Sequence, residues 1–138
     1  MSKATARRSS LEGVDLACRC ALRADALQAE DVRVLDLRGI SQLTDFFVIA
    51  SGTSLPQLKA IRDEVRDGLV AEADLRPAHR EDTAESLWIV LDYIDVMVHI
   101  FHRDLRKYYA LEDLWSDARE VDWGKGEALP GEGGDGAR

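Results

Sequence analysis

Two groups of residues are of types that could act on a nucleotide. Ser51-Gly52-Thr53 follows an apolar run and precedes a helical pattern, where the N–H groups at a helix start can hold phosphate. Asp92 and Asp95 belong to a later hairpin, and carboxylates are common protein ligands of Mg²⁺. The spacing Asp-x-x-Asp across a turn directs the two carboxylates apart, however, and no Gly-rich loop with a lysine accompanies them. The sequence therefore favours a turn and a helix cap over a phosphate site.

The histidines and cysteines do not form a pattern that suits a metal ion or a nucleophile. His99 and His102 are three residues apart on a predicted strand, so they face opposite sides of it. His79 lies in a polar segment without a recognisable partner. Cys18 and Cys20 fall on a predicted helix roughly 200° apart, which favours small buried side chains over a disulfide. The sequence predicts no catalytic residue, no metal site and no cofactor.

The length and charge of the chain limit what it can bind. Its 138 residues suit a single domain with one core. The formal net charge of −8 weighs against a broad phosphate-binding surface and favours a protein partner, in particular a basic one. No apolar run approaches the ~20 residues that cross a bilayer, and the first ten residues lack the apolar core of a secretory signal. We expect the chain to be cytoplasmic.

Residues 86–102 organise the rest of the predicted fold. Two runs rich in β-branched and aromatic residues, 87–93 and 96–102, are separated by a polar joint and predict adjacent antiparallel strands. Both runs are apolar at nearly every position, which is typical of strands at the centre of a sheet that is covered on both faces. Helices expected at residues 12–28 and 54–73 would provide this cover.

Other segments complete the predicted elements. Residues 32–37 and 46–50 predict a second antiparallel pair of strands. The polar residues 74–85 predict a loop with at most a short edge strand. Asp104 is a good N-cap for a short helix that carries Tyr108 and Tyr109.

The two ends of the chain differ in composition from the rest. Residues 1–10 and 124–138 have too little apolar content to offset the entropy of ordering, so they predict disordered tails. The remaining residues, 11–123, form one predicted domain. Its class is α/β, with a mixed sheet of about five strands and flanking helices.

Trp88 is the residue for which an interface role competes best with a core role. Alternation along the strand places Trp88, Val90 and Asp92 on one face, whose Asp92 end we expect to be exposed. The other face carries Leu87, Ile89, Leu91 and Tyr93. Aromatic residues in strands are usually core, yet exposed aromatics are the usual anchors of protein interfaces. The residues alone favour the core slightly.

Four segments resemble the ribosomal silencing factor family, also called iojap-like proteins. They are Leu35-Asp36-Leu37-Arg38-Gly39-Ile40-Ser41, Thr44-Asp45-Phe46-Phe47-Val48-Ile49-Ala50-Ser51-Gly52-Thr53-Ser54, the hairpin 88–102, and Arg106-Lys107-Tyr108-Tyr109-Ala110-Leu111-Glu112-Asp113-Leu114-Trp115. The resemblance extends over residues 12–122, and its motifs are long and in order.

The resemblance implies an α/β fold of nucleotidyltransferase type without the catalysis. Family members bind the large ribosomal subunit through L-fourteen, a protein of its intersubunit face. There they block association with the small subunit and repress translation under nutrient limitation. Homodimers are common among them. For this chain the resemblance implies the same partner. The net charge and the lack of a membrane-length apolar run predict little direct nucleic-acid contact and no membrane.

This sequence departs from the family pattern at two positions. Ile94 occupies a hairpin position where the family usually has glycine. A two-residue primed turn needs a positive φ, which a β-branched residue resists, so we expect a longer turn or one of another type. Glu81 is followed by Asp82 where an acidic residue followed by glycine is typical, which predicts a differently shaped loop.

The resemblance favours an interface role for Trp88 over a core role. The predicted partner-binding residues are Trp88, Asp92, Asp95, Met97, Tyr108, Tyr109 and Leu111. Two other functions stay open at this point. One is a nucleotidyltransferase-like, magnesium-dependent enzyme that uses Asp92 and Asp95, and the other is a dimeric adaptor with another partner.

Overall fold

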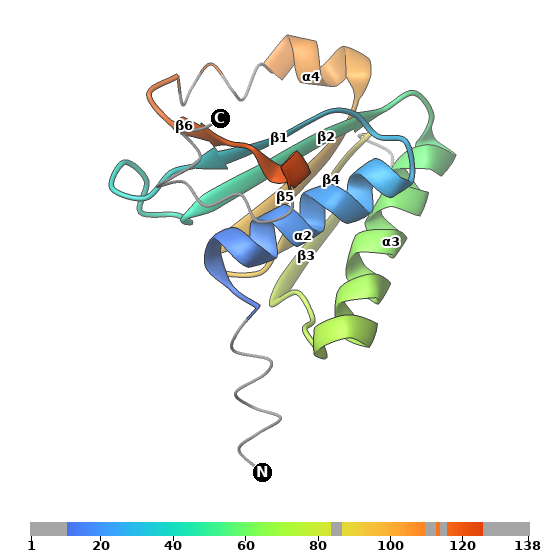
Figure 1. Ribbon diagram of the computed structural model, residues 1–138. Helices are drawn as coiled ribbons and strands as arrows, with labels where there is room; N and C mark the ends of the chain where they lie inside the picture. Colours follow the sequence, from blue (N-terminus) through green and yellow to red (C-terminus); the bar gives the residue numbers. More distant parts are fainter. Residues whose placement is uncertain (1–10, 84–86, 110–112, 114–115, 126–138) are drawn as a thin grey trace.

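The computed structural model describes residues 11–83, 87–109, 113 and 116–125. Within these residues a six-stranded sheet has the order β3-β4-β5-β2-β1-β6 (Figure 1). The elements are α2 (Gly13–Ala26), β1 (Glu30–Asp36), β2 (Phe46–Gly52), α3 (Leu55–Ala73), β3 (His79–Thr83), β4 (Trp88–Asp92), β5 (Val96–His102), α4 (Arg103–Tyr109), β6 (Arg119–Val121) and η2 (Trp123–Lys125).

The sheet is mixed, as the sequence predicts. β2 and β5 pair in parallel at its centre, and β2 is buried along its whole length. The remaining pairs are antiparallel, including the expected pairs β1–β2 and β4–β5. β3 is the short edge strand expected within residues 74–85, and it includes Glu81 and Asp82, for which a loop was expected.

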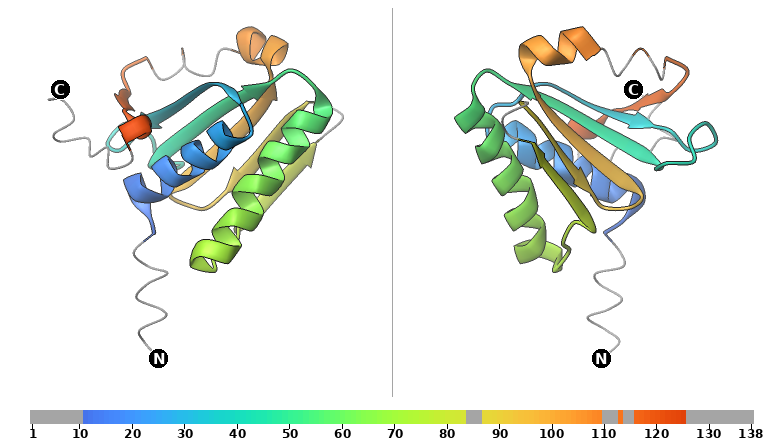
Figure 2. Two further views of the ribbon diagram at one scale, coloured as in Figure 1. Left: turned by 45° about the vertical axis from the view of Figure 1, so that its right-hand side comes forward. Right: turned by 180° about the vertical axis from the view of Figure 1, so that it is seen from behind.

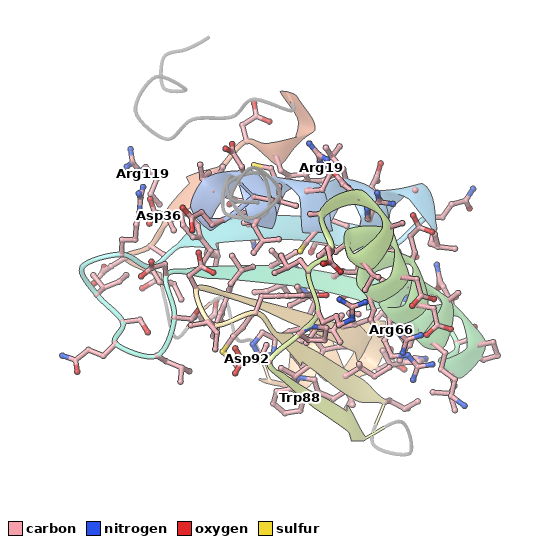
Figure 3. All side chains as sticks on the ribbon, turned by 90° about the horizontal axis from the view of Figure 1, so that it is seen from below. Arg19, Asp36, Arg66, Trp88, Asp92 and Arg119 are labelled. Atoms are coloured by element: carbon pink, nitrogen blue, oxygen red, sulfur yellow. The ribbon has the colours of Figure 1, made fainter. Side chains whose placement is uncertain are left out.

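β6 is the strand that the sequence analysis missed. It has only three residues, of which two are exposed, so it shows no alternation that could predict a strand. Arg33 on β1 holds Glu120 of β6 with a side-chain hydrogen bond of 2.8 Å. Arg119 approaches Asp36 at 3.8 Å, and both are labelled in Figure 3.

The two long helices lie on the same face of the sheet (Figure 2). Strand residues such as Val48 and Leu91 join one buried cluster with Leu16 of α2 and Ile61 of α3. The prediction that these helices cover both faces is therefore wrong. Apolar periodicity shows that both faces avoid water, but it does not show which element covers each face.

Ion pairs hold α2 against α3. The Arg23 guanidinium donates hydrogen bonds to Glu64 (2.9 Å) and Glu72 (2.7 Å). A Cβ at position 68 would collide with this guanidinium, so Gly68 has a packing reason for its place inside α3. Glycine weakens a helix by about 1 kcal/mol relative to alanine, and here it makes room for the cross-helix pairs.

Most predicted boundaries shift by one or two residues, and those of α4 and of the C-terminal tail matter for the predicted residue roles. α4 begins at Arg103, so Asp104 lies in the first turn of the helix and is not its N-cap. Gly124 and Lys125, assigned to the C-terminal tail, belong to the 3₁₀ turn η2. Trp123 fixes this turn because its Nε1 donates to the Val32 carbonyl at 2.9 Å. Residues 1–10 and 126–138 lie outside the described residues.

The turn between β4 and β5 is of another type than a two-residue primed turn, although Ile94 adopts the positive φ that its β-branched side chain was expected to resist. Asp95 N donates to the Tyr93 carbonyl at 3.0 Å, and Ile94 has φ of 79°. This i to i+2 bond around a positive φ is the rarer, strained form of the γ-turn. The Asp92 carboxylate accepts a hydrogen bond from Ile94 N (2.8 Å), and Thr44 Oγ1 donates to the Ile94 carbonyl (3.1 Å).

We predict that Ile94→Gly stabilises the protein. Glycine adopts the positive φ without strain, whereas a side chain there costs on the order of 1 kcal/mol or more. Little burial is lost, because 66% of Ile94 is exposed. Thermal unfolding of the two proteins measures the effect. Ile94→Val, which remains β-branched, is the matched control and should leave the midpoint almost unchanged. A lower midpoint for Ile94→Gly would contradict the prediction.

Candidate functional site

The Ser51-Gly52-Thr53 segment bonds to groups of its own chain. Thr53 N donates to Gln57 Oε1 at 2.8 Å, and Gln57 N donates to Ser54 Oγ at 3.3 Å. A Cβ at Gly52 would lie 2.9 Å from the same Gln57 oxygen, so the glutamine side chain fills the space beside this segment. The helix cap is confirmed at Ser54, whereas Ser51 and Gly52 belong to the end of β2 and not to a turn.

The carboxylates of Asp92 and Asp95 accept hydrogen bonds from different backbone N–H groups. Asp92 caps Ile94 N within the hairpin turn. Asp95 Oδ2 accepts a hydrogen bond of 2.8 Å from Gly13 N, at the start of α2. The two side chains are directed apart, as their spacing predicts. Among the residues that the structure describes, no three His, Cys, Asp or Glu side chains are grouped to hold a metal ion.

The sheet face opposite α2 and α3, here called the open face, carries a second apolar cluster. Its buried members are Leu35, Leu37, Phe47, Ile49 and Phe101. Trp88, Met97, Leu105 and Ala118 pack against it and are partly buried. Figure 3 shows Trp88 and Asp92 on this side of the sheet, away from α2. The predicted division of the β4 side chains between two faces is confirmed, because Ile89 and Leu91 are buried in the helix-side cluster.

Trp88 is held by aromatic neighbours on β5. Its ring stacks on Phe101 with the ring centroids 4.9 Å apart and an interplanar angle of 25°. Its Nε1 donates to Nδ1 of His99 at 3.2 Å. Phe47 meets the His99 ring edge to face, with the centroids 4.6 Å apart. Trp88 itself is half-buried, so its indole has a packed side and a side open to solvent.

His99 is the buried titratable group of the open face. Only 6% of the residue is exposed, and burial lowers the pKa of its imidazole to about 4. The ring is therefore neutral at neutral pH. Because Nδ1 accepts the indole proton, the ring proton must lie on Nε2. This Nε2 is buried and has no hydrogen-bond partner among the described residues.

The structure brings together three of the predicted partner-binding residues. Trp88, Asp92 and Met97 share the open face, and Asp92 is paired with Met97 in the β4–β5 register. Asp95 does not join them, because its carboxylate is directed to the start of α2. Tyr108 and Tyr109 lie in α4, but their side chains are outside the described part of the structure. Leu111 lies outside the described residues.

The sequence analysis missed His99 and Phe101 as supports of Trp88. Alternation along β5 from Met97 was a usable signal, since it places residues 97, 99 and 101 on one face. The pairing that puts Trp88 opposite Phe101 required the strand register as well. The exposed large apolar residues of the β1–β2 loop and the β4–β5 turn, Ile40 (44%), Leu43 (67%) and Ile94 (66%), were also missed.

These features define a small α/β domain with an aromatic cluster on the sheet face that its long helices leave open. Residues 10–133 match the family model described as ribosomal silencing factor during starvation. The chain therefore belongs to the ribosomal silencing factor family, as the four segments predict. Membership supports a ribosome-associated silencing role. In the part of the chain that the structure describes, no helix is long and apolar enough to cross a membrane.

Individual relatives agree with the family match. Ribosomal silencing factor RsfS of Bacillus subtilis is 42% identical over 98 residues, which cover 71% of this chain and 82% of that protein. The chloroplastic protein Iojap of Arabidopsis thaliana is 32% identical over 117 residues, covering 80% of this chain and 46% of that one.

Solved structures agree on the fold. A crystal structure of a Chromobacterium violaceum protein has a TM-score of 0.68 and 29% identity, covering 76% of this chain and 88% of that one. A Bacillus halodurans structure has a TM-score of 0.63 and 37% identity, covering 75% of this chain and 94% of that one.

We predict that stability falls as the pH drops from about 6.5 to about 4 because of His99. The unfolded imidazole has a pKa near 6.5, so in this window the unfolded chain takes up a proton that the folded chain does not. The full effect is about 3 kcal/mol. Denaturant unfolding at a series of pH values measures it.

The control uses two histidine variants. His99→Phe removes the titrating group and should flatten the dependence in this window. His102→Gln removes a different histidine and should retain the part of the dependence that His99 causes. An equal slope in wild type and His99→Phe would show that other groups cause it.

Proposed function

We propose that this chain binds the large ribosomal subunit through ribosomal protein L-fourteen and blocks association with the small subunit. It thereby represses translation under nutrient limitation, in the cytoplasm and without catalysis. Family membership supports the ribosomal part of this proposal. The self-capped Ser51-Gly52-Thr53 segment and the diverging Asp92 and Asp95 carboxylates favour a binding role over the transferase alternative.

The proposal rests on the position and packing of the Trp88 side chain. A half-buried indole lies on a rigid aromatic support, beside Met97, on the sheet face that the long helices do not cover. Large aromatic side chains with one packed and one open side are the usual energetic centres of protein interfaces. The open face is thus the surface that we assign to the ribosomal partner.

Charge supports a basic partner. The chain carries a formal net charge of −8, and Asp92 places a carboxylate beside Met97 on the open face. Complementary charge at the edge of an interface mainly accelerates association, and added salt weakens the effect. Asp92 is the carboxylate of the predicted pair that can act in this way, because its bond to Ile94 N lies at the exposed hairpin turn, whereas Asp95 is directed to the start of α2. Tyr108, Tyr109 and Leu111 remain predicted neighbours of the same surface.

We predict that Trp88→Ala weakens binding to dissociated large subunits by on the order of thirtyfold. Truncating an anchoring aromatic costs about 2 kcal/mol or more, and each 1.4 kcal/mol is a factor of ten in affinity. Co-sedimentation gives the affinity, and light scattering of mixed subunits gives the block of subunit joining. Circular dichroism establishes that the variant is folded.

Trp123→Ala is the matched control. It removes a tryptophan that packs against the helix-side cluster, so a folded variant should bind and block joining like wild type. Asp92→Asn tests the charge argument, because it keeps an oxygen for Ile94 N and should slow association at low salt. A folded Trp88→Ala protein with wild-type binding would remove Trp88 from the interface. Wild-type protein that ignores large subunits would overturn the proposed function.

We propose homodimerisation through the same face when the ribosomal partner is absent. The half-buried side chains of Trp88, Met97 and Leu105 would leave water when two copies meet. Sedimentation velocity over a range of concentrations tests this. Wild type should shift toward a dimer as concentration rises, whereas Trp88→Ala should remain monomeric. Equal behaviour of the two proteins would place any dimer contact elsewhere.

A further inference from the structure

His99 lies where an apolar residue would be expected. It is 6% exposed, its ring contacts Phe47 and Phe101, and it belongs to the same sheet face as the apolar cluster. Its Nε2 is buried without a hydrogen-bond partner among the described residues. An unpaired buried N–H destabilises a protein, and a hydrocarbon ring of similar size would avoid this penalty. Fold stability therefore does not explain a histidine here.

The imidazole supplies one feature that a hydrocarbon ring lacks. Its Nδ1 is an unprotonated nitrogen, and it accepts the hydrogen bond from Trp88 Nε1 at 3.2 Å. Burial keeps this acceptor available, because it lowers the pKa of the imidazole to about 4. Phe101 contacts the flat face of the same indole at a centroid distance of 4.9 Å. One neighbour thus fixes the plane of the indole, and the other fixes its direction within that plane.

We propose that His99 is a positioning residue that holds the Trp88 indole in the orientation in which it meets the partner. The consequence for binding rests on the function proposed above. A side chain that is already fixed loses less conformational freedom when it enters an interface. The hydrogen bond is therefore an element of preorganisation, and its effect is a moderate gain in affinity.

A purely structural role for His99 makes a different prediction. If the imidazole only fills space, substitutions that lower stability should weaken binding, and those that preserve stability should preserve binding. A positioning role separates the two properties. Removing the acceptor while keeping the packing should loosen the indole and weaken binding without loss of stability.

Three variants of His99 make the comparison. His99→Phe keeps an aromatic ring and removes the acceptor. His99→Asn is smaller but retains an oxygen near the place of Nδ1. His99→Leu also removes the acceptor, with a side chain that is not aromatic. It is the variant to use if the phenylalanine ring is too large for the site. Each full-length protein is measured for thermal midpoint, hydrogen exchange of the Trp88 indole N–H by NMR, and affinity for dissociated large subunits.

The expected results differ in direction between the variants. His99→Phe should have an unchanged or higher thermal midpoint and faster exchange of the Trp88 indole N–H. Its affinity for large subunits should be three- to tenfold lower. This is the loss expected when one side chain must be immobilised on binding, since about 1.4 kcal/mol is a factor of ten. His99→Asn should have a lower midpoint, yet slower indole exchange and tighter binding than His99→Phe. Trp88→Phe identifies the indole signal.

The outcomes separate this proposal from the proposed function. Indole exchange in His99→Phe as slow as in wild type would overturn the positioning role. Faster exchange with unchanged affinity, in a system where Trp88→Ala loses binding, would also overturn it and leave the proposed function intact. If wild-type protein does not bind large subunits, the proposed function fails, and so does the binding role of His99.

Discussion

Parallel pairing of β2 with β5 is the constraint on which both faces of the molecule depend. It aligns Phe47 with Met97, Ile49 with His99, and Ser51 with Phe101, between segments far apart in the sequence. Side chains alternate along a strand, so a slip of one residue would exchange the two faces. In the observed register the helix side receives Phe46 together with small and branched aliphatic residues of β2 and β5, and the open face receives Phe47, Ile49 and Phe101.

Contacts at both ends of the sheet fix this arrangement. At one end, Asp95 bonds to Gly13, and its carbonyl accepts from the backbone N–H groups of Asp45 and Phe46. At the other end, the buried Arg106 of α4 donates to Ser51 Oγ at 2.9 Å. The strained turn at Ile94 is therefore embedded in a network that joins the hairpin to α2 and to the β1–β2 loop. A face held at both ends in this way is a suitable platform for a partner that must be met in a fixed orientation.

Sequence patterns predicted the elements better than their arrangement. β-branched runs located the hairpin, and apolar periodicity located both long helices, because these signals are local. The edge strand was expected only as an option within the polar residues 74–85, which show no strand pattern of their own. The side on which α3 lies depends on long-range packing, and β6 is too short to show a period. The roles of Asp95 and His99 arise from contacts with residues distant in sequence, Gly13 in the first case and Trp88 in the second. Trp88 itself was predictable as a candidate because family resemblance added to the alternation of β4.

The proposed function assigns the open face to the ribosomal partner. Hydroxyl-radical footprinting of the full chain, alone and with dissociated large subunits, tests it most directly, since tryptophan and methionine side chains are readily oxidised. We expect bound subunits to protect Trp88 and Met97, whereas Trp123, on the helix side, should react at the same rate in both samples. Undiminished oxidation of Trp88 and Met97 in the bound state, with protection confined to α2 or α3, would contradict it.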